Sequence, residues 1–169
     1  MNKRKNILIT LVFFGVLNIF GTCRFSMRDV SIPAEIKTVK INMFENRARY
    51  INPQLAPRLT DKLRQKIINQ TRLSQTNSDA HYEITATITD YSQSTSGITD
   101  RQTSSNNLNV TVHLQLVNRL DNKKNIETDI TRSFPFSGNL SLSQAETQLG
   151  DQMVNNITDE IFNRIFSNW

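Results

Sequence analysis

The sequence predicts an α+β fold, a two-layer sandwich in which a mainly antiparallel four-strand sheet carries two helices packed on one face. Four segments alternate apolar and polar residues, as half-buried strands do. Two others repeat apolar residues at steps of three and four, which is typical of amphipathic helices. The predicted order is strand, helix, strand, strand, strand, helix (β-α-β-β-β-α). Two helices with one apolar stripe each can both be buried on a single sheet face.

The first strand and the first helix follow each other between residues 36 and 71. Residues 36–44, "IKTVKINMF", place Val39, Ile41 and Met43 on one face and polar residues on the other. Asn52-Pro53 predicts a helix start, because asparagine caps a helix and proline is tolerated at its first position. The helix is then predicted to run to about Thr71 on an apolar stripe every four residues: Leu55, Leu59, Leu63 and Ile67.

Three consecutive strands are predicted at 81–89, 108–116 and 126–136. Tyr91 breaks the alternation of the first, which predicts a bulge or strand end near Asp90. Residues 92–106 are polar and aperiodic and predict a long loop, and residues 117–125 predict a turn. In the third strand Ile126, Ile130, Phe134 and Phe136 share one parity. Pro135 argues against a central place in the sheet at that end.

The second helix is predicted in the C-terminal segment. Ser143 and Glu146 fit a capping box at its start. Gly150 weakens the helix by about 1 kcal/mol relative to alanine without ending it. The apolar stripe is Leu142, Ala145, Leu149, Met153, Ile157, Ile161 and Ile165.

The N-terminus has the pattern of a secretory signal peptide over residues 1–22. Three basic residues at 3–5 precede the apolar run 7–20, which is shorter than the roughly 20 residues that a membrane-spanning helix needs. An uncleaved membrane anchor is the alternative. The remaining chain holds a 23–35 tether and a single α+β domain at 36–169. Without residues 1–22 it is close to neutral, which argues against a nucleic-acid binder.

Cys23 is the only cysteine and ends the signal segment. A disulfide or a thiolate metal site would need companions, so an inert thiol or a modified one remains. Phe20-Gly21-Thr22-Cys23 resembles a bacterial lipobox, with Thr22 standing where glycine, alanine or serine is usual. The resemblance implies that Cys23 carries the acyl chains of a lipoprotein, and buried acyl chains hold a protein on a membrane.

No catalytic residue, metal site or cofactor is predicted. The sequence contains none of the usual nucleophile, phosphate-loop, dinucleotide, zinc-protease or calcium-loop motifs. His113 falls on the polar parity of its strand, where we expect a solvated side chain. We therefore expect a protein that is not an enzyme.

An ordered set of segments resembles the lipopolysaccharide-assembly lipoprotein family of the LptE type. The set comprises residues 31–73, "ITDY" at 88–91, "LNVTVHLQLVN" with "DNKKN" after it, and the ending "IFNRIFSNW". The resemblance implies an outer-membrane, lipid-anchored protein that faces the periplasm. Its partners would be an outer-membrane β-barrel lipopolysaccharide translocon, lipopolysaccharide itself and, through acylated Cys23, the lipid of that membrane.

Cations in the two connections of the predicted meander are the candidate contacts with lipopolysaccharide or the barrel. Arg101 lies in the 92–106 loop, and Arg119, Lys123 and Lys124 lie at the next turn. Lysine and arginine bind phosphate by charge-assisted hydrogen bonds, although solvated turn charges are common. The alternative function is a lipoprotein that activates a periplasmic cell-wall synthase. The predicted tether of about 12 residues reaches some 40 Å at most, which favours a partner in the same membrane.

Overall fold

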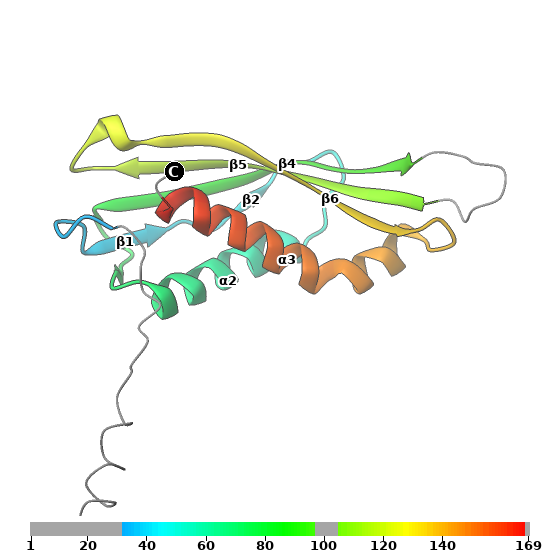
Figure 1. Cartoon of the computed structure of the whole chain (residues 1–169), viewed down its shortest axis with the longest axis horizontal. Coiled ribbons are helices and arrows are strands. Elements are labelled where there is room, and N and C mark those ends of the chain that lie inside the picture. Colours follow the sequence, from blue (N-terminus) through cyan, green and yellow to red (C-terminus); the bar gives the residue numbers. More distant parts are fainter. Residues whose placement is uncertain (1–31, 97–104, 168–169) are drawn as a thin grey trace, which may run out of the picture.

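The computed structural model describes residues 32–96 and 105–167. Two helices lie side by side under one face of a twisted sheet (Figure 1), so the predicted two-layer α+β architecture is confirmed. The predicted signal peptide, Cys23 and most of the 23–35 tether lie outside the described residues. The strands are β1 (Thr38–Ile41), β2 (Glu45–Asn46), β3 (Ser74–Gln75), β4 (Tyr82–Ser96), β5 (Ser105–Asn118) and β6 (Ile126–Ser137). The helices are α2 (Leu55–Gln70), α3 (Leu142–Phe166) and the short 3-10 turn η1 (Asn122–Lys124).

The sheet corrects the prediction of a mainly antiparallel four-strand sheet. Over the described residues it has six strands in the order β3-β1-β4-β5-β6, and β2 also pairs with β4. The pairs β4–β5 and β5–β6 are antiparallel, but β1, β2 and β3 make parallel pairs. The reason is the connection through α2. A helix that returns the chain to the starting end of β1 makes the next strand run in the same direction as β1.

The predicted strand at 36–44 is interrupted, and this reverses the orientation of its last residues. β1 pairs with β4 up to Ile41–Ile84, and pairing resumes only at Glu45–Thr87 in β2. Three residues therefore face two across the ladder. Met43, predicted to point inward, is 58% exposed, whereas Phe44 is buried and its N–H donates to Thr60 Oγ1 at 3.0 Å. The expectation for Met43 was wrong because period two fails across a bulge.

The strands β4 and β5 are longer than predicted. They stay paired as far as Ser96 and Ser105, so residues 92–96 and 105–106 of the predicted 92–106 loop are strand, and residues 97–104 lie outside the description. The predicted irregularity near Asp90 is confirmed as a register shift between Ile88 and Asp90. It turns Tyr91 inward, where the residue is buried. β6 is an edge strand, as Pro135 suggested.

Both helix starts differ from the predicted ones. The α2 N-cap is Gln54 rather than Asn52, whose Oδ1 instead accepts the Gln54 N–H at 3.0 Å. The α3 capping box is formed by Ser141 and Gln144, two residues before the predicted pair. Glu146 instead accepts hydrogen bonds from the Tyr91 hydroxyl at 2.9 Å and the Asn52 amide at 3.2 Å. The Glu146 carboxylate thus makes a tertiary contact, whereas the local sequence pattern predicted that it would cap the helix.

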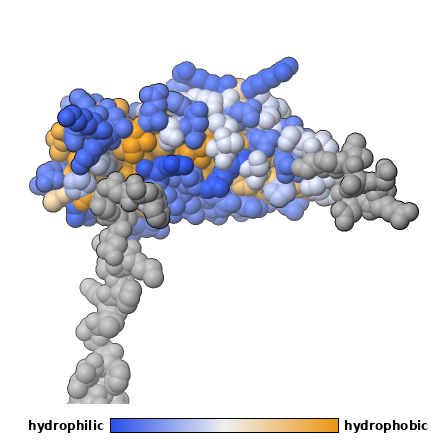
Figure 2. Space-filling view, turned by 45° about the horizontal axis from the view of Figure 1, so that its top comes forward, coloured by the Kyte–Doolittle hydropathy of each residue, from blue (hydrophilic) through white to orange (hydrophobic). Residues whose placement is uncertain are grey.

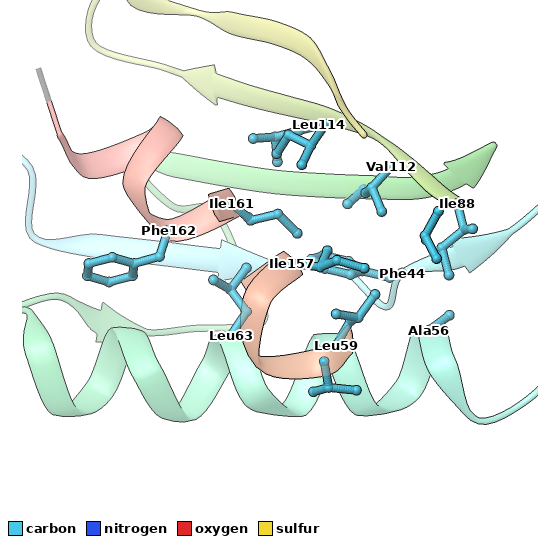
Figure 3. Packing of buried hydrophobic residues seen from close by; sticks show 14 of the residues in the cluster. Phe44, Ala56, Leu59, Leu63, Ile88, Val112, Leu114, Ile157, Ile161 and Phe162 are labelled. Carbon is cyan, nitrogen blue, oxygen red and sulfur yellow. The ribbon is translucent and has the colours of Figure 1, made fainter. Parts of the chain in front are cut away.

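The core lies between the sheet and the two helices (Figure 3). Leu59 and Leu63 of α2 meet Ile157 and Ile161 of α3 beneath the sheet. The α2 stripe is buried in full, and so is the α3 stripe from Ala145 to Ile165, which confirms both apolar patterns. Each fully buried aliphatic side chain stabilises the fold by about 1.5–3 kcal/mol. The helices thus cover one face of the sheet, and the other face is accessible for contacts outside the domain.

Candidate functional site

The sheet face turned away from the helices is the candidate binding surface, and we call it the open face. Figure 2, in which the upper side of Figure 1 is turned toward the viewer, shows pale and blue residues along this side, with orange residues among them toward its left and middle. Alternate residues of three strands form it. Its polar members are Glu83, Thr85, Thr87, Asp90, Ser92 and Ser94 of β4, Asn107, Asn109, Thr111, His113 and Gln115 of β5, and Glu127, Asp129, Thr131 and Ser133 of β6, and Val117 and Pro135 are apolar members.

Lateral hydrogen bonds order the middle of the open face. The Asn109 amide donates to Ser94 Oγ at 3.0 Å and accepts from the Ser133 hydroxyl at 2.6 Å, so it joins three strands. Thr111 and Thr131 share a hydroxyl contact of 3.0 Å. Hydroxyls and amides retain further donors and acceptors after such bonds. The face therefore offers an ordered, hydrated and mostly uncharged surface.

His113 lies between two carboxylates near one end of this face. Its Nδ1 is 2.7 Å from Asp129 Oδ1, and its Nε2 is 3.3 Å from Glu127 Oε1. The hydrogen bond to Asp129 raises the pKa of the His113 imidazole, and the nearby Glu127 charge adds to this. The sequence placed His113 on the polar parity but missed its partners. Asp129 lies directly opposite in the register of β5 and β6, which periodicity alone does not give.

Glu83 gathers three donors at the end of the open face where β4 begins. Its carboxylate accepts from Arg119 at 2.8 Å, from the Asn42 amide at 3.1 Å and from Lys40 at 3.2 Å. These contacts, Arg119 first, lower the pKa of Glu83 to about 2. Arg119 also lies 3.7 Å from Asp79. The candidate Arg119 is thus engaged inside the domain, where its charge ties the β5–β6 turn to the sheet.

The other candidate cations lie in two connections that are attached to opposite ends of β5. Lys123 and Lys124 are exposed in η1, where Asp121 caps the Lys123 N–H. Arg101 lies outside the described residues, in the segment that joins Ser96 to Ser105. That segment and η1 are attached to opposite ends of β5, whose 14 residues span about 45 Å. The described strands therefore separate the two attachment points by the length of the sheet.

Within the described residues, no cluster of histidine, cysteine and acidic side chains is suited to hold a metal ion. In the same part of the chain, no helix is long and apolar enough to cross a membrane.

A family model for lipopolysaccharide assembly, LptE, matches residues 36–165, which include every helix and strand described above except the last residue of α3. The chain belongs to the LptE family. No curated protein sequence matches it.

Solved structures share the fold of this LptE-family chain at low sequence identity. A minor lipoprotein of Acinetobacter baumannii is 15% identical and has a TM-score of 0.51, over 77% of this chain and 92% of its own. Protein CT253 of Chlamydia trachomatis is 12% identical with a TM-score of 0.50, over 77% and 95% of the two chains.

The open face was the part of this LptE-family domain that sequence reasoning described only in outline. The alternation in 108–116 predicted that one face of the strand is polar, and its exposed parity confirms this. The cross-strand contacts of Asn109 and His113 depend on register over three strands. A count outward from the predicted turn at 117–125, which places Leu116 opposite Ile126, would have paired His113 with Asp129.

Proposed function

We propose that this LptE-family protein is an outer-membrane lipoprotein that acts as the non-catalytic partner of a β-barrel lipopolysaccharide translocon. It is anchored through acylated Cys23 and faces the periplasm. Its task is to assist assembly of the barrel and passage of lipopolysaccharide to the cell surface. The observation that carries the proposal is the open face, which is polar and largely uncharged, in a chain whose family is that of lipopolysaccharide assembly.

The shape of the domain suits a plug inside a hydrated barrel. Strands of 14 and 15 residues give the hairpin β4–β5 a length of about 45 Å. The outward apolar band of a membrane barrel is about 25 Å tall. A hairpin of this length extends past such a band, and polar side chains along it hydrogen-bond to water or to a polar lumen.

The direction of the chain orients the proposed plug relative to its anchor. Val39 pairs with Tyr82, which pairs with Asn118, so the N-terminal segment enters at the η1 end of the sheet. The nine residues from Cys23 to Ile32 reach about 30 Å at most. In this arrangement Lys123 and Lys124 stay near the anchored end, and the segment that contains Arg101 is attached to β5 at its other end.

Affinity purification of the full chain from solubilised outer membrane tests the proposal. Mass spectrometry should find a large β-barrel protein and lipopolysaccharide in the eluate. Depletion of the protein should lower the amount of assembled barrel. Recovery of a cell-wall synthase without a barrel would replace this function with the alternative one. The Cys23→Ala variant should lose its acyl mass and leave the outer membrane, and an unmodified cysteine in the parent protein would contradict lipidation.

The separation of the cations allows their roles to be tested one end at a time. Arg101→Glu and the pair Lys123→Glu with Lys124→Glu should each keep the fold, since Lys123 and Lys124 are exposed and Arg101 lies outside the predicted core. The end that touches lipid A phosphates should lose lipopolysaccharide binding more at low salt than at 0.15 M, where the screening length is about 8 Å. Unchanged binding in both proteins would remove the cations from the proposal and leave the partner role intact.

A further inference from the structure

A shallow groove runs between α2 and α3 on the solvent-facing side of the helical layer. Three hollows of about 360, 450 and 300 Å³ follow one another along it. The first two share Arg58, and the second and third share Lys62, Gln65 and Asn155. The two helices run in the same direction along this groove (Figure 1). Their residues therefore meet at a constant offset along the contact.

Polar residues repeat every four positions on both walls of the groove, all of them charged except Asn155, and we call the set the charge ladder. It consists of Arg58, Lys62 and Lys66 on α2 and of Asp151, Asn155 and Asp159 on α3. The first rung is the ion pair Arg58–Asp151, and the third is the ion pair Lys66–Asp159, each with N···O of 2.5 Å. A step of four residues keeps side chains on one helix face.

The first rung depends on a glycine. A Cβ added at Gly150 would lie 3.0 Å from Arg58 Nη1. Glycine in a helix interior costs about 1 kcal/mol relative to alanine. The space above Gly150 lets the Arg58 guanidinium cross from α2 onto α3 and reach Asp151. The ladder is thus built into the packing of the two helices.

The middle rung has a cation and no anion. Lys62 and Asn155 line the same two hollows, but Asn155 supplies an amide where the neighbouring rungs supply a carboxylate. The adjacent Asp61 lies 3.5 Å from Arg64. Among residues 32–96 and 105–167, Lys62 has no ion pair and Asn155 no side-chain hydrogen bond. Lys62 and Asn155 thus bring an unpaired cation and an amide to the same hollows of the groove.

We propose that an acidic side chain of the partner polypeptide completes this middle rung. The inference rests on the proposed function and takes the partner to be the translocon barrel. A carboxylate there would accept from Lys62 and from the Asn155 amide, which repeats the chemistry of the two flanking rungs. A phosphate group carries about −1.5 to −2 charges and would lie between Asp151 and Asp159, so a single carboxylate is the better match.

The position of the groove fits a protein that is enclosed by its partner. Residues of α2 and α3 line the groove. These helices cover one side of the sheet (Figure 1), and the open face is the other side. A plug inside a barrel meets the surrounding wall on both broad sides. The polar open face then contacts the lumen wall or the water in the lumen. On the helical side, the charge ladder binds one acidic side chain of the wall.

Two substitutions in the full chain test the middle rung. Asn155→Asp supplies the missing carboxylate from within the chain, and Lys62→Gln removes the cation. Both should weaken retention of the purified barrel about tenfold at low salt, in line with one charge-assisted hydrogen bond. The loss should shrink at 1 M salt. Thermal unfolding of both variants should match the parent, or rise slightly for Asn155→Asp.

The matched controls carry the same chemical changes outside the groove. Asn156→Asp adds the same charge on the next residue of α3, which is exposed and lines none of the three hollows. Lys37→Gln removes an exposed lysine before β1. Both controls should retain the barrel as the parent does. Equal losses in the controls, or normal retention by Asn155→Asp and Lys62→Gln, would overturn the inference while leaving the partner role standing.

Zero-length carbodiimide cross-linking of the purified complex tests the identity of the acid. The Lys62 amine should become joined to an aspartate or glutamate peptide of the barrel, and Lys62→Gln should abolish that product. In Asn155→Asp the cross-link should form within the chain instead. A Lys62 cross-link to no protein carboxylate would contradict the inference. A parent chain that recovers no barrel would overturn the proposed function, and this inference with it.

Discussion

The two faces of the sheet come from the same alternating strands but are stabilised in different ways. Toward the helices, β5 buries Leu108, Val110, Val112 and Leu114 completely. Toward the other side, the intervening residues meet their neighbours through hydrogen bonds and ion pairs. Burial is non-directional and proportional to area, whereas each polar contact needs a particular partner at a particular distance. The covered face therefore tolerates little change in polarity, and the open face should tolerate much more.

The largest expected effect is that of a charge placed in the covered face. Ile157 is 1% exposed between the helices and the sheet. Ile157→Asp should destabilise the domain by about 3–5 kcal/mol, because a buried carboxylate without a partner keeps its desolvation cost. This is a large share of the roughly 5–15 kcal/mol by which a typical domain is stable. Denaturant or thermal unfolding followed by circular dichroism measures the change.

The same substitution on the open face is the control for this comparison. Thr131 is exposed on the edge strand β6. Thr131→Asp should change the free energy of unfolding by no more than about 1 kcal/mol, as surface substitutions usually do. If Ile157→Asp unfolds like the parent, or if both variants lose equal stability, the two faces do not differ as described.

The second effect is the pH dependence contributed by Glu83, the most strongly bound carboxylate of the open face. Its pKa of about 2 in the folded protein lies below its ordinary value of 4.5. The contribution is therefore present above about pH 4.5 and is lost as the pH falls from there toward 2. Since the site is at the surface and screened by solvent, we expect Glu83→Gln to cost about 1–2 kcal/mol at pH 7.

The comparison of parent and variant over pH separates this effect from general acid unfolding. Between pH 5 and pH 2 the stability of Glu83→Gln should fall less steeply than that of the parent, and the two curves should converge. Arg119→Gln should show most of the same loss at neutral pH, because Arg119 is the main donor to Glu83. Parallel curves for parent and Glu83→Gln would show that Glu83 is not held in its charged form by the fold.

The covered face was predicted from sequence almost completely, and the physical reason is its periodicity. Residues spaced four apart lie on one side of an α-helix, as do Leu55, Leu59, Leu63 and Ile67. Any apolar surface can bury such a stripe, so its burial can be predicted without knowing which residues it contacts. Phe44 is the exception, since a three-against-two interruption between β1 and β2 reversed the parity there. Such a bulge depends on contacts with Thr60 of α2 that the local sequence does not contain.

The polar contacts were much harder to predict. Arg119 was a candidate for an external ligand, yet Glu83, 36 residues away along the chain, holds it. Glu146 was assigned to a helix cap, yet it binds Tyr91 and Asn52. Charge pairing depends on three-dimensional register, which depends in turn on the position of every bulge and turn. The cations could therefore be identified from the sequence, but the sequence does not tell which of them form ion pairs within the domain.

The smallest expected effect concerns His113 in the open face, and the observable is its pKa. The Asp129 carboxylate stabilises the protonated ring and raises its pKa, so the pair contributes stability below the ordinary histidine pKa near 6.5 and loses it as the pH rises through the raised value. Asp129→Asn should move the His113 titration to lower pH. Glu127→Gln should move it less, because that carboxylate lies at 3.3 Å rather than 2.7 Å.

Proton NMR of the imidazole signals can follow this directly, since the chain has only two histidines. His81 is the internal reference. Its Nδ1 accepts from the Thr38 N–H at the β1–β4 contact, away from Asp129, so its signal reports on the sheet independently of the Asp129 change. A change of the His81 signal together with that of His113 would indicate a general change of the sheet. If the pKa of His113 does not change in Asp129→Asn, the Asp129 contact is absent in solution. The side chains of the open face would then be hydrated individually, and lateral hydrogen bonds would not order them.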